Sequence, residues 1–429
     1  MNKLFTSLFT IQMLFSVNIF CQNYTSYFTG STNNISTSPL GGICLMGGST
    51  EDDNAMRWFL EQANGGDILV LRTSGSDGYN EYLYSQLGIS VNSVETIVFN
   101  SSSAVNENYI HEKILGAEAI WFAGGNQWNY VNYIRDTEVN VLINEAISER
   151  NIVIGGTSAG MAIMGGYYFT AQNGTVTSDV AMSNPFDNRV QVDGDPFLQN
   201  EILTNVITDQ HYDDPNRKGR HIVFMSRILL EYGAPVAGIA CDEYTAVCID
   251  NTGNARVFGE YPDYDDNAYF LQVNCEVAEN YPETCSPGQE LEWNQNNSAI
   301  KVYQVKGTYE GENSFDLNSW DSGIGGVWHN WYVSNGELFE NQSTEIQCQS
   351  MSTAQVTNTD FAIYPNPTTD LIYLNSEILL EAVISDLSGK EVLRRKVRKN
   401  LNISSLEKGT YILTLSDGLS SYNHKIIKK

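Results

Sequence analysis

Residues 151–160 of the 429-residue chain read Asn-Ile-Val-Ile-Gly-Gly-Thr-Ser-Ala-Gly, and an apolar run, Met161 to Met164, follows them. The apolar residues 152–154 predict a short buried strand, the glycines predict a sharp turn, and the run after the turn predicts a helix. Residues 156–160 fit the G-x-S-x-G pattern of a nucleophile elbow, in which small residues on both sides of the serine let strand and helix approach closely. Ser158 is therefore a candidate nucleophile, and a capping serine in an ordinary glycine-rich turn is the alternative.

Strand and helix patterns alternate on the N-terminal side of this turn. Strands are expected at residues 42–46, 67–71, 94–99, 119–122 and 152–154, with helices between them at 49–60, 79–87, 105–115 and 128–150. This alternation predicts an α/β fold with a mostly parallel sheet covered by helices on both faces. Ligands bind such sheets beyond the carboxyl ends of the strands. Gly47-Gly48, Gly124-Gly125 and Ser158 all follow strands, so they should meet at that edge, which favours the elbow interpretation.

The distribution of charge limits the class of partner. The net charge is −27, and residues 1–360 hold 14 Lys and Arg against 44 Asp and Glu, whereas residues 361–429 hold 10 against 7. A strongly acidic body disfavours nucleic acid and anionic membranes. With five histidines, no H-E-x-x-H and no C-x-x-C, the sequence predicts no metal site and no cofactor.

The N-terminus carries a targeting pattern. Lys3 precedes a mostly apolar run over residues 4–20, which predicts a secretory signal peptide at residues 1–22, with a membrane anchor or a lipoprotein site at Cys21 as alternatives. An exported protein can form disulfides. Cys275 and Cys285, ten residues apart, are the expected pair, whereas Cys44 lies in an apolar strand and is expected to be a small buried residue.

The remainder of the chain divides into three parts. Residues 23–345 are expected to form one domain, in which residues 222–232 are helical and residues 238–244 and 246–250 form paired strands. A polar linker follows at 346–360, and residues 361–429 predict a small all-β sandwich. This last module resembles the C-terminal sorting domain of type IX secretion in its opening Tyr-Pro-Asn-Pro (364–367), its Asp-Leu-Ser-Gly-Lys (386–390) and its Gly-Thr-Tyr (409–411). That resemblance implies a secreted or cell-surface protein.

A serine nucleophile needs a general base, usually a histidine. His211 lies in a dense polar run, residues 209–221, that directly follows a strand-like segment. A loop at the end of a strand, with Asp209, Arg217 and Arg220 as neighbours, is more typical of a binding loop than of a buried core. His211 is therefore the candidate base, with His329 as the alternative.

Three motifs, taken together, resemble the cyanophycinase and dipeptidase E family of serine peptidases. They are Gly-Gly-Asn-Gln (124–127), Gly-Thr-Ser-Ala-Gly (156–160) and Asp-Gln-His (209–211), in that order and spacing. The resemblance spans roughly residues 40–260 and implies a fold similar to class I glutamine amidotransferases. It implies a Ser158–His211 pair and an oxyanion hole formed by the N–H groups of Gly125 and Ala159. It also implies an orienting acid 15 to 20 residues past the serine, for which Asp179 is the nearest, with an oxygen of Thr177 or Ser178 as the alternative.

The same resemblance implies a substrate with an aspartyl peptide bond, either the β-linked Asp-Arg of cyanophycin or an N-terminal Asp-X bond. An Arg-rich loop follows the histidine in cyanophycin-degrading members, and Pro215 stands here in place of one expected arginine. The residues expected to bind substrate are Gln127, Asp209, Gln210, Arg217 and Arg220, and a guanidinium of this set would pair with a substrate carboxylate.

Two other functions remain open: an esterase of the α/β-hydrolase type and a catalytically inactive secreted binding protein on the same scaffold. Glutamine amidotransfer is disfavoured, because that chemistry needs a cysteine at the elbow. The expected partners are a peptide or polyamide substrate and the type IX secretion machinery. Formation of a homodimer is left open.

Overall fold

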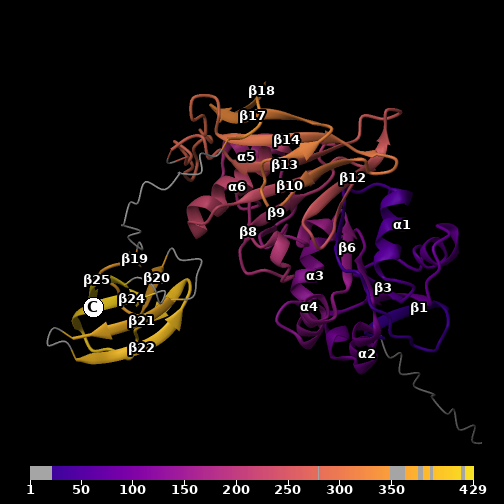
Figure 1. Ribbon diagram of the computed structural model, residues 1–429, viewed down its shortest axis with the longest axis horizontal. Coiled ribbons are helices and arrows are strands. Elements are labelled where there is room, and N and C mark those ends of the chain that lie inside the picture. Colours follow the sequence, from indigo (N-terminus) through magenta and orange to yellow (C-terminus); the bar gives the residue numbers. More distant parts are fainter. Residues whose placement is uncertain (1–21, 279, 348–362, 375–379, 387–389, 417–420) are drawn as a thin grey trace, which may run out of the picture. The chain divides into compact units, whose positions relative to one another are not determined.

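The computed structural model describes residues 22–429 except 279, 348–362, 375–379, 387–389 and 417–420 (Figure 1). The chain divides after Cys348 into two compact units. The predicted signal peptide, apart from Gln22, lies outside the described residues, as does the predicted linker from residue 348 onwards. Among the residues that the structure describes, no helix is both long and apolar enough to cross a bilayer.

The first unit is built on a ten-stranded sheet in the order β1-β4-β3-β5-β6-β2-β11-β12-β15-β16. Its centre, β4-β3-β5-β6-β2, is parallel throughout and consists of the five strands that the sequence predicts, with the elbow strand β6 between β5 and β2. The strands are β1 Tyr24–Gly30, β2 Ile43–Met46, β3 Asp67–Arg72, β4 Ser93–Phe99, β5 Ala119–Phe122, β6 Val153–Thr157, β11 Ala246–Ile249, β12 Asn254–Tyr261, β15 Asn313–Asp316 and β16 Gly323–Ile324.

Helices cover both faces of this sheet, as predicted. α1 (Asp53–Gln62) packs its Met56 and Phe59 on one face, and α2 (Asn108–Gly116), α3 (Gln127–Ile134) and α4 (Glu138–Arg150) pack on the other. The single helix expected at 128–150 is wrong, because Asp136 takes a left-handed φ of +60° between α3 and α4. The helix expected at 79–87 is reduced to one π-helical turn, Tyr82–Gln86.

A second, six-stranded sheet of the first unit has the order β18-β17-β14-β13-β10-β9. α5 (Ser178–Ser183) and α6 (Lys218–Tyr232) share a buried apolar cluster with it. β9 and β10 are parallel, and the other neighbours are antiparallel. The strands are β9 Val206–Asp209, β10 Ala237–Cys241, β13 Asn267–Val273, β14 Ile300–Lys306, β17 Gly326–Ser334 and β18 Glu337–Gln342. A two-stranded sheet pairs β7 (Tyr168–Phe169) with β8 (Val192–Asp193).

The hairpin predicted from residues 238–250 is wrong. β10 pairs with β9 and β13 in the second sheet, whereas β11 pairs with β2 and β12 in the first sheet. The two strands belong to different sheets, so the four residues between them, 242–245, pass from one sheet to the other. Residues 242–245 are called the crossing segment.

The second unit consists of two small sheets, β19-β20-β23 and β22-β21-β24-β25, with an apolar core of their own. This is the all-β module that the sequence predicts. Its strands are β19 Ile363–Tyr364, β20 Leu371–Leu374, β21 Leu380–Ser385, β22 Glu391–Val397, β23 Asn400–Asn402, β24 Gly409–Ser416 and β25 Ser421–Lys428.

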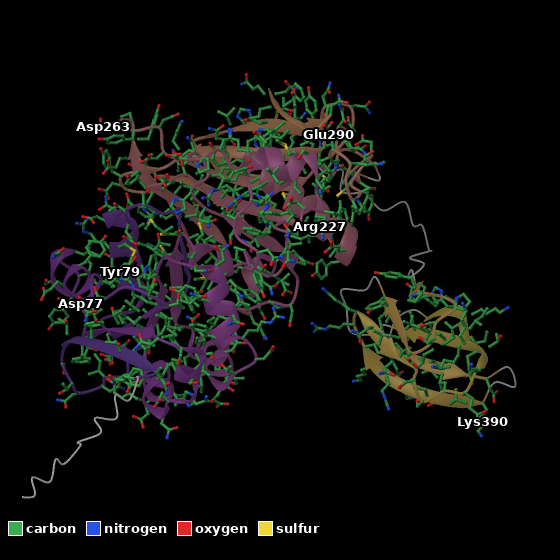
Figure 2. All side chains as sticks on the ribbon, turned by 180° about the vertical axis from the view of Figure 1, so that it is seen from behind. Asp77, Tyr79, Arg227, Asp263, Glu290 and Lys390 are labelled. Atoms are coloured by element: carbon green, nitrogen blue, oxygen red, sulfur yellow. The ribbon has the colours of Figure 1, made fainter. Side chains whose placement is uncertain are left out.

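Exposed carboxylates are spread over the first unit, and Asp77, Asp263 and Glu290 are labelled among them in Figure 2. The predicted disulfide between Cys275 and Cys285 is not formed. Cys285 is a free thiol 3.6 Å from the hydroxyl oxygen of Ser226, whereas Cys275 is disulfide-bonded.

Candidate active site

The turn after β6 has the strained backbone of a nucleophile elbow. Ser158 takes a left-handed φ of +51°, which non-glycine residues rarely adopt. Only glycine fits two residues before and two residues after the serine, because a side chain would clash there. A Cβ on Gly156 would lie 2.7 Å from the backbone carbonyl carbon of Gly160, and a Cβ on Gly160 would lie 2.0 Å from the carbonyl oxygen of Phe122. The small residues two before and two after the serine therefore have the predicted role.

The helix expected directly after the elbow is wrong. A single 3-10 turn, Met161–Ile163, follows, and its three residues are buried beside β6 and β9. A long helix dipole is thus absent behind Ser158. Any stabilisation of negative charge at the serine must come from individual N–H groups near it.

His211 directly contacts the candidate nucleophile. Its Nε2 lies 2.8 Å from Oγ of Ser158, a hydrogen-bond distance. His211 follows the end of β9, takes a φ of +47° and donates its backbone N–H to the carbonyl of Gly47 at 2.9 Å. β2 and β9 thus bring the histidine to the elbow. The alternative base, His329, lies in β17 and is paired with Gln342 of β18.

The carboxylate beside His211 comes from the crossing segment between the two sheets. Oε1 of Glu243 lies 2.5 Å from Nδ1 of His211, and the backbone N–H of Glu243 donates to the carboxylate of Asp213 at 2.9 Å. Burial alone would raise the pKa of Glu243. Hydrogen bonds from Ser49 and His211 outweigh that effect and hold the pKa below 4.5, so the carboxylate is ionised at neutral pH.

Asp179 does not occupy this position. It is exposed in the first turn of α5, and the structure shows no hydrogen bond or ion pair between it and His211 in the described part of the chain. The sequence signal that could have identified Glu243 is weak: an acidic residue just past an apolar strand, at the carboxyl end of β10 beside β9. Glu243 can be predicted at the site only when β10 is known to belong to the second sheet, beside β9.

Gly48 leaves the space that the imidazole of His211 occupies. Gly48 has a φ of +123°, and a Cβ there would lie 2.4 Å from both Cε1 and Nε2 of the ring. The Gly48 carbonyl also accepts the N–H of Tyr244 at 3.1 Å, so this short loop is bonded to the segment that carries Glu243.

We expect Gly48→Ala to displace the ring from Ser158. A displacement of about 1 Å costs on the order of 10²-fold in rate, so kcat should fall by about that factor while the thermal unfolding transition is kept. Gly78→Ala is the matched control, because a Cβ at Gly78 would meet no atom within 4 Å. Equal activity of the two variants would show that the ring does not need this space.

A cavity of about 180 Å³ opens beside the serine. Gly125 and Ser158 line it, and a Cβ on Gly124 would lie 3.5 Å from Cβ of Ser158, so the turn after β5 lies against the elbow. Within the described residues, the N–H groups of Gly125 and Ala159 donate no hydrogen bond to another protein group. Both amides therefore remain without a described partner near the serine, and their role as an oxyanion hole stays a prediction. The residues lining the cavity are Gly125, Gln127, Ser158, Phe169, Ala171, Thr175, Gln210, His211, Arg217 and Arg220.

Two of the residues expected to bind substrate are bound to each other instead. Asp209 and Arg220 are both 1% exposed and form a two-pronged ion pair, with Nε of Arg220 2.8 Å from Oδ2 of Asp209. Burial alone would raise the pKa of Asp209, but the charge of Arg220 lowers it below its usual value. Arg220 also donates to Thr175 and to the carbonyl of Val176. Nε, Nη1 and Nη2 of Arg220 and both carboxylate oxygens of Asp209 thus have partners within the chain, so the expectations that Arg220 holds a substrate carboxylate and that Asp209 binds substrate are wrong. The pair supports the floor of the cavity.

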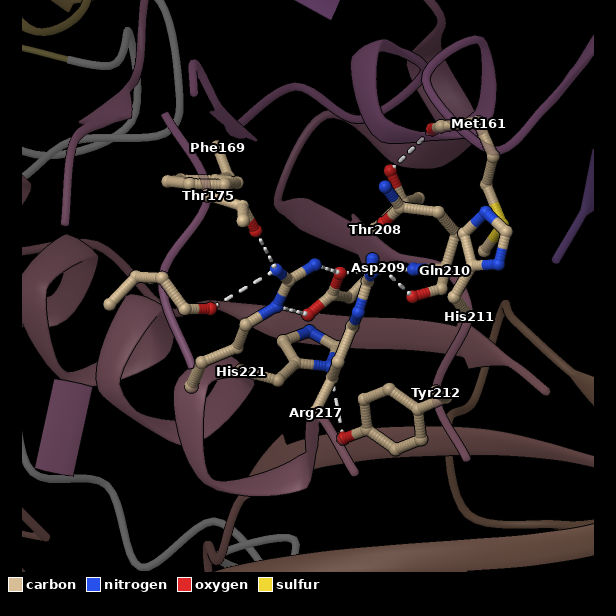
Figure 3. A network of polar contacts seen from close by, with 12 residues as sticks. Met161, Phe169, Thr175, Thr208, Asp209, Gln210, His211, Tyr212, Arg217 and His221 are labelled. Atoms are coloured by element: carbon tan, nitrogen blue, oxygen red, sulfur yellow. Dashed lines mark hydrogen bonds and ion pairs between the residues drawn. The ribbon is translucent and has the colours of Figure 1, made fainter. Parts of the chain in front are cut away.

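Arg217 is the guanidinium in the cavity that keeps free donors. Its Nη1 donates to the carbonyl of Gln210 at 3.1 Å (Figure 3), and its Nε is buried without a partner. Among the described residues, no carboxylate forms an ion pair with Arg217. Burial, followed by the neighbouring charge of Arg220, lowers the pKa of Arg217 to about 10. Such a partly buried cation without a counter-ion favours binding of an anion.

Two amide side chains complete the cavity. Gln127 begins α3 and donates its Nε2 to the carbonyl of Phe169 at 3.0 Å, which joins α3 to β7 across the cavity wall. The Oε1 of Gln210 is buried without a hydrogen-bond partner, so it is an acceptor available to a bound molecule. The other histidine of this loop, His221, is fully buried against Tyr212 (Figure 3), and burial lowers its pKa to about 4, so it is a neutral core residue.

Two parts of the chain are similar to known protein families. Residues 76–257, which include Ser158, His211 and Glu243, match the model described as "Peptidase family S51", and residues 362–429 match the one described as "Secretion system C-terminal sorting domain". Cyanophycinases from Trichormus variabilis and Synechococcus elongatus are both 26% identical to the chain. The first match covers 39% of this chain and 51% of that relative, and the second covers 40% and 48%. The chain therefore spans about half the length of the curated relatives it matches.

Among solved structures, a peptidase from an acI-B1 Actinobacterium is 13% identical with a TM-score of 0.41, covering 65% of this chain and 98% of that one. A putative peptidase E protein from Listeria monocytogenes EGD-e is 18% identical with a TM-score of 0.34, covering 51% of this chain and 98% of that one. The sequence matches, together with the elbow, show one similarity for each part of the chain: residues 76–257 are similar to peptidase family S51, and residues 362–429 are similar to a secretion system C-terminal sorting domain.

Proposed function

We propose that the first unit is a serine peptidase in which Ser158, His211 and Glu243 act as nucleophile, general base and orienting acid. The observation that carries this proposal is the continuous set of hydrogen bonds from the strained serine through both ring nitrogens of His211 to Glu243, at 2.8 and 2.5 Å. Nucleophile, base and orienter at these distances are the recurrent arrangement of serine hydrolases on unrelated folds.

The mechanism follows from the positions of the atoms. Oγ of Ser158 attacks the peptide carbonyl while Nε2 of His211 takes its proton, and the ionised Glu243 stabilises the imidazolium that forms. The N–H groups of Gly125 and Ala159 hold the oxyanion. His211 then gives the proton to the leaving amine, and a water molecule, deprotonated by His211, hydrolyses the acyl-enzyme.

We propose that the acyl residue of the substrate is aspartate, in either an α- or a β-linked peptide bond. The support is chemical: the small cavity beside Ser158 holds one unpaired guanidinium, on Arg217, and a free acceptor oxygen, on Gln210. A short side chain with a carboxylate would pair with the guanidinium of Arg217, and an amine N–H of the substrate would donate to the oxygen of Gln210. The named activity of the cyanophycinase relatives supports the same class of bond.

Replacement of Arg217 tests the substrate assignment. In Arg217→Gln, kcat/KM for an aspartyl substrate is expected to fall about 10²–10³-fold, because a desolvated charge pair contributes on the order of 2–5 kcal/mol. The same variant should change kcat/KM for the matching asparaginyl substrate far less. Lys218→Gln is the matched control, because Lys218 is paired with Glu340 and does not line the cavity. An equal loss for both substrates would exclude recognition of a carboxylate by Arg217.

We further propose that the protein is secreted by the type IX pathway through its second unit and acts outside the cell or on its surface. The match of residues 362–429 to a secretion sorting domain supports this route. Deleting residues 362–429 should keep the peptidase in the cells, and full release of the truncated protein into the medium would rule out the route.

A further inference from the structure

Two buried cysteines face each other across the pair of strands that joins the parallel centre of the first sheet to its antiparallel part. Cys44 of β2 and Cys248 of β11 are direct register partners, and their sulfur atoms are 3.6 Å apart. They are 0% and 1% exposed. Both are reduced in this structure.

The hydrogen bonds of this strand pair show which type of cross-strand position the two cysteines occupy. The N–H of Gly47 donates to the carbonyl of Thr245, its direct partner in the same register, so these two residues form a hydrogen-bonded pair. The two types of pair alternate along an antiparallel ladder. Cys44 and Cys248 lie three positions further on and therefore form a non-hydrogen-bonded pair.

This position matches the geometry of a disulfide. In non-hydrogen-bonded pairs the Cα atoms are about 4.5 Å apart and the side chains are close. A disulfide spans Cα distances of about 4.4–6.8 Å. The backbone of β2 and β11 can therefore stay in place, and rotation of the two side chains is enough to close the remaining gap between the sulfur atoms.

We propose that Cys44 and Cys248 form a disulfide in the exported protein. The two thiols lose two protons and two electrons, and the oxidant is another disulfide, such as that of a thiol–disulfide oxidoreductase, which is reduced to two thiols by exchange. Oxidation precedes burial of the strands, because the folded core excludes the oxidant. Cys275 is already disulfide-bonded, and the proposed secretion route, on which this inference rests, leads to a compartment where disulfides persist.

The bond would join the two segments that hold the candidate site together. β2 leads directly into Gly47 and Gly48, which contact His211, and β11 begins three residues after Glu243. A covalent link between β2 and β11 keeps the segments that hold His211 and Glu243 together when this strand pair begins to open. Cys241 is also fully buried, but its sulfur lies against the carbonyl of Leu45 and has no described sulfur partner, so it stays a thiol.

The test is cysteine mapping of the full chain. The chain is refolded in a mixture of oxidised and reduced glutathione in which Cys275 forms its disulfide. The protein is denatured with N-ethylmaleimide present, digested without reductant and analysed by mass spectrometry. The expected result is a cross-linked peptide pair containing Cys44 and Cys248, with maleimide on Cys241 and Cys285. Maleimide on both Cys44 and Cys248 would overturn the proposal.

A second measurement does not depend on the digest. The midpoint of thermal unfolding is compared between protein refolded with its disulfides formed and protein refolded with all disulfides reduced. For the wild type, the reduced protein is expected to unfold several degrees lower. The fall should be smaller in the Cys44→Ala/Cys248→Ala variant, which can lose only the Cys275 bond. Cys241→Ala is the matched control and should show the full wild-type fall. Equal falls in all three proteins would contradict the proposal.

Discussion

Ser158→Ala is expected to abolish hydrolysis, with a loss in kcat of about 10⁴–10⁶-fold, the range found when a serine nucleophile is removed. The loss is large because the histidine and the oxyanion groups then have no atom that attacks the carbonyl. Removing one hydroxyl from a strained turn should leave the fold intact. The measurement is steady-state hydrolysis of aspartyl peptides and of β-Asp-Arg polymer by the purified variant.

Ser183→Ala serves as the control for the effect of losing a hydroxyl. Ser183 is exposed at the end of α5 and bonds only to the carbonyl of Val180 among the described residues. Its replacement is expected to leave kcat unchanged. Hydrolysis by Ser158→Ala at the wild-type rate would remove Ser158 from the mechanism, and with it the proposed peptidase chemistry.

Glu243→Gln should reduce kcat by about 10³–10⁴-fold, the scale observed when the orienting carboxylate of a catalytic histidine becomes an amide. The shape of the side chain is preserved, but the negative charge that stabilises the imidazolium of His211 is lost. The amide can also donate to Nδ1, which would favour the tautomer that leaves a proton on Nε2, the atom that must accept one from Ser158.

Asp179→Asn is the matched comparison, because it makes the same chemical change at the acid that the sequence favours. Asp179 is exposed and has no described contact with His211, so its replacement should leave kcat unchanged. If Asp179→Asn lost activity while Glu243→Gln kept it, the arrangement seen around His211 would not be the one that works in catalysis.

The parallel sheet and the elbow could be predicted because their signals are local. Runs of three to five apolar residues followed by glycines mark β2, β5 and β6. The spacing of glycines around Ser158 reflects the close approach of backbone at one turn. His211 could also be predicted, since a polar run directly after a strand belongs at the edge where the elbow lies.

Glu243 could not be predicted for a physical reason: it depends on which sheet each of two adjacent strands joins. Two short apolar strands separated by four residues look like a hairpin, and only their distant partners, β13 and β2, separate them. The different roles of Arg220 and Arg217 could not be predicted either, for the same reason. Both are arginines three residues apart, and only the fold shows that Asp209 neutralises one and leaves the other without a counter-ion.

The most direct test of the central claim, that His211 activates Ser158 under the control of Glu243, is the rate of covalent labelling by a fluorophosphonate at pH 7. Peptide mapping should place one adduct per chain on Ser158 of the wild type, with labelling slowed strongly in His211→Ala and in Glu243→Gln. Labelling of a different serine together with loss of activity, or equal rates at Ser158 in all three proteins, would contradict the account.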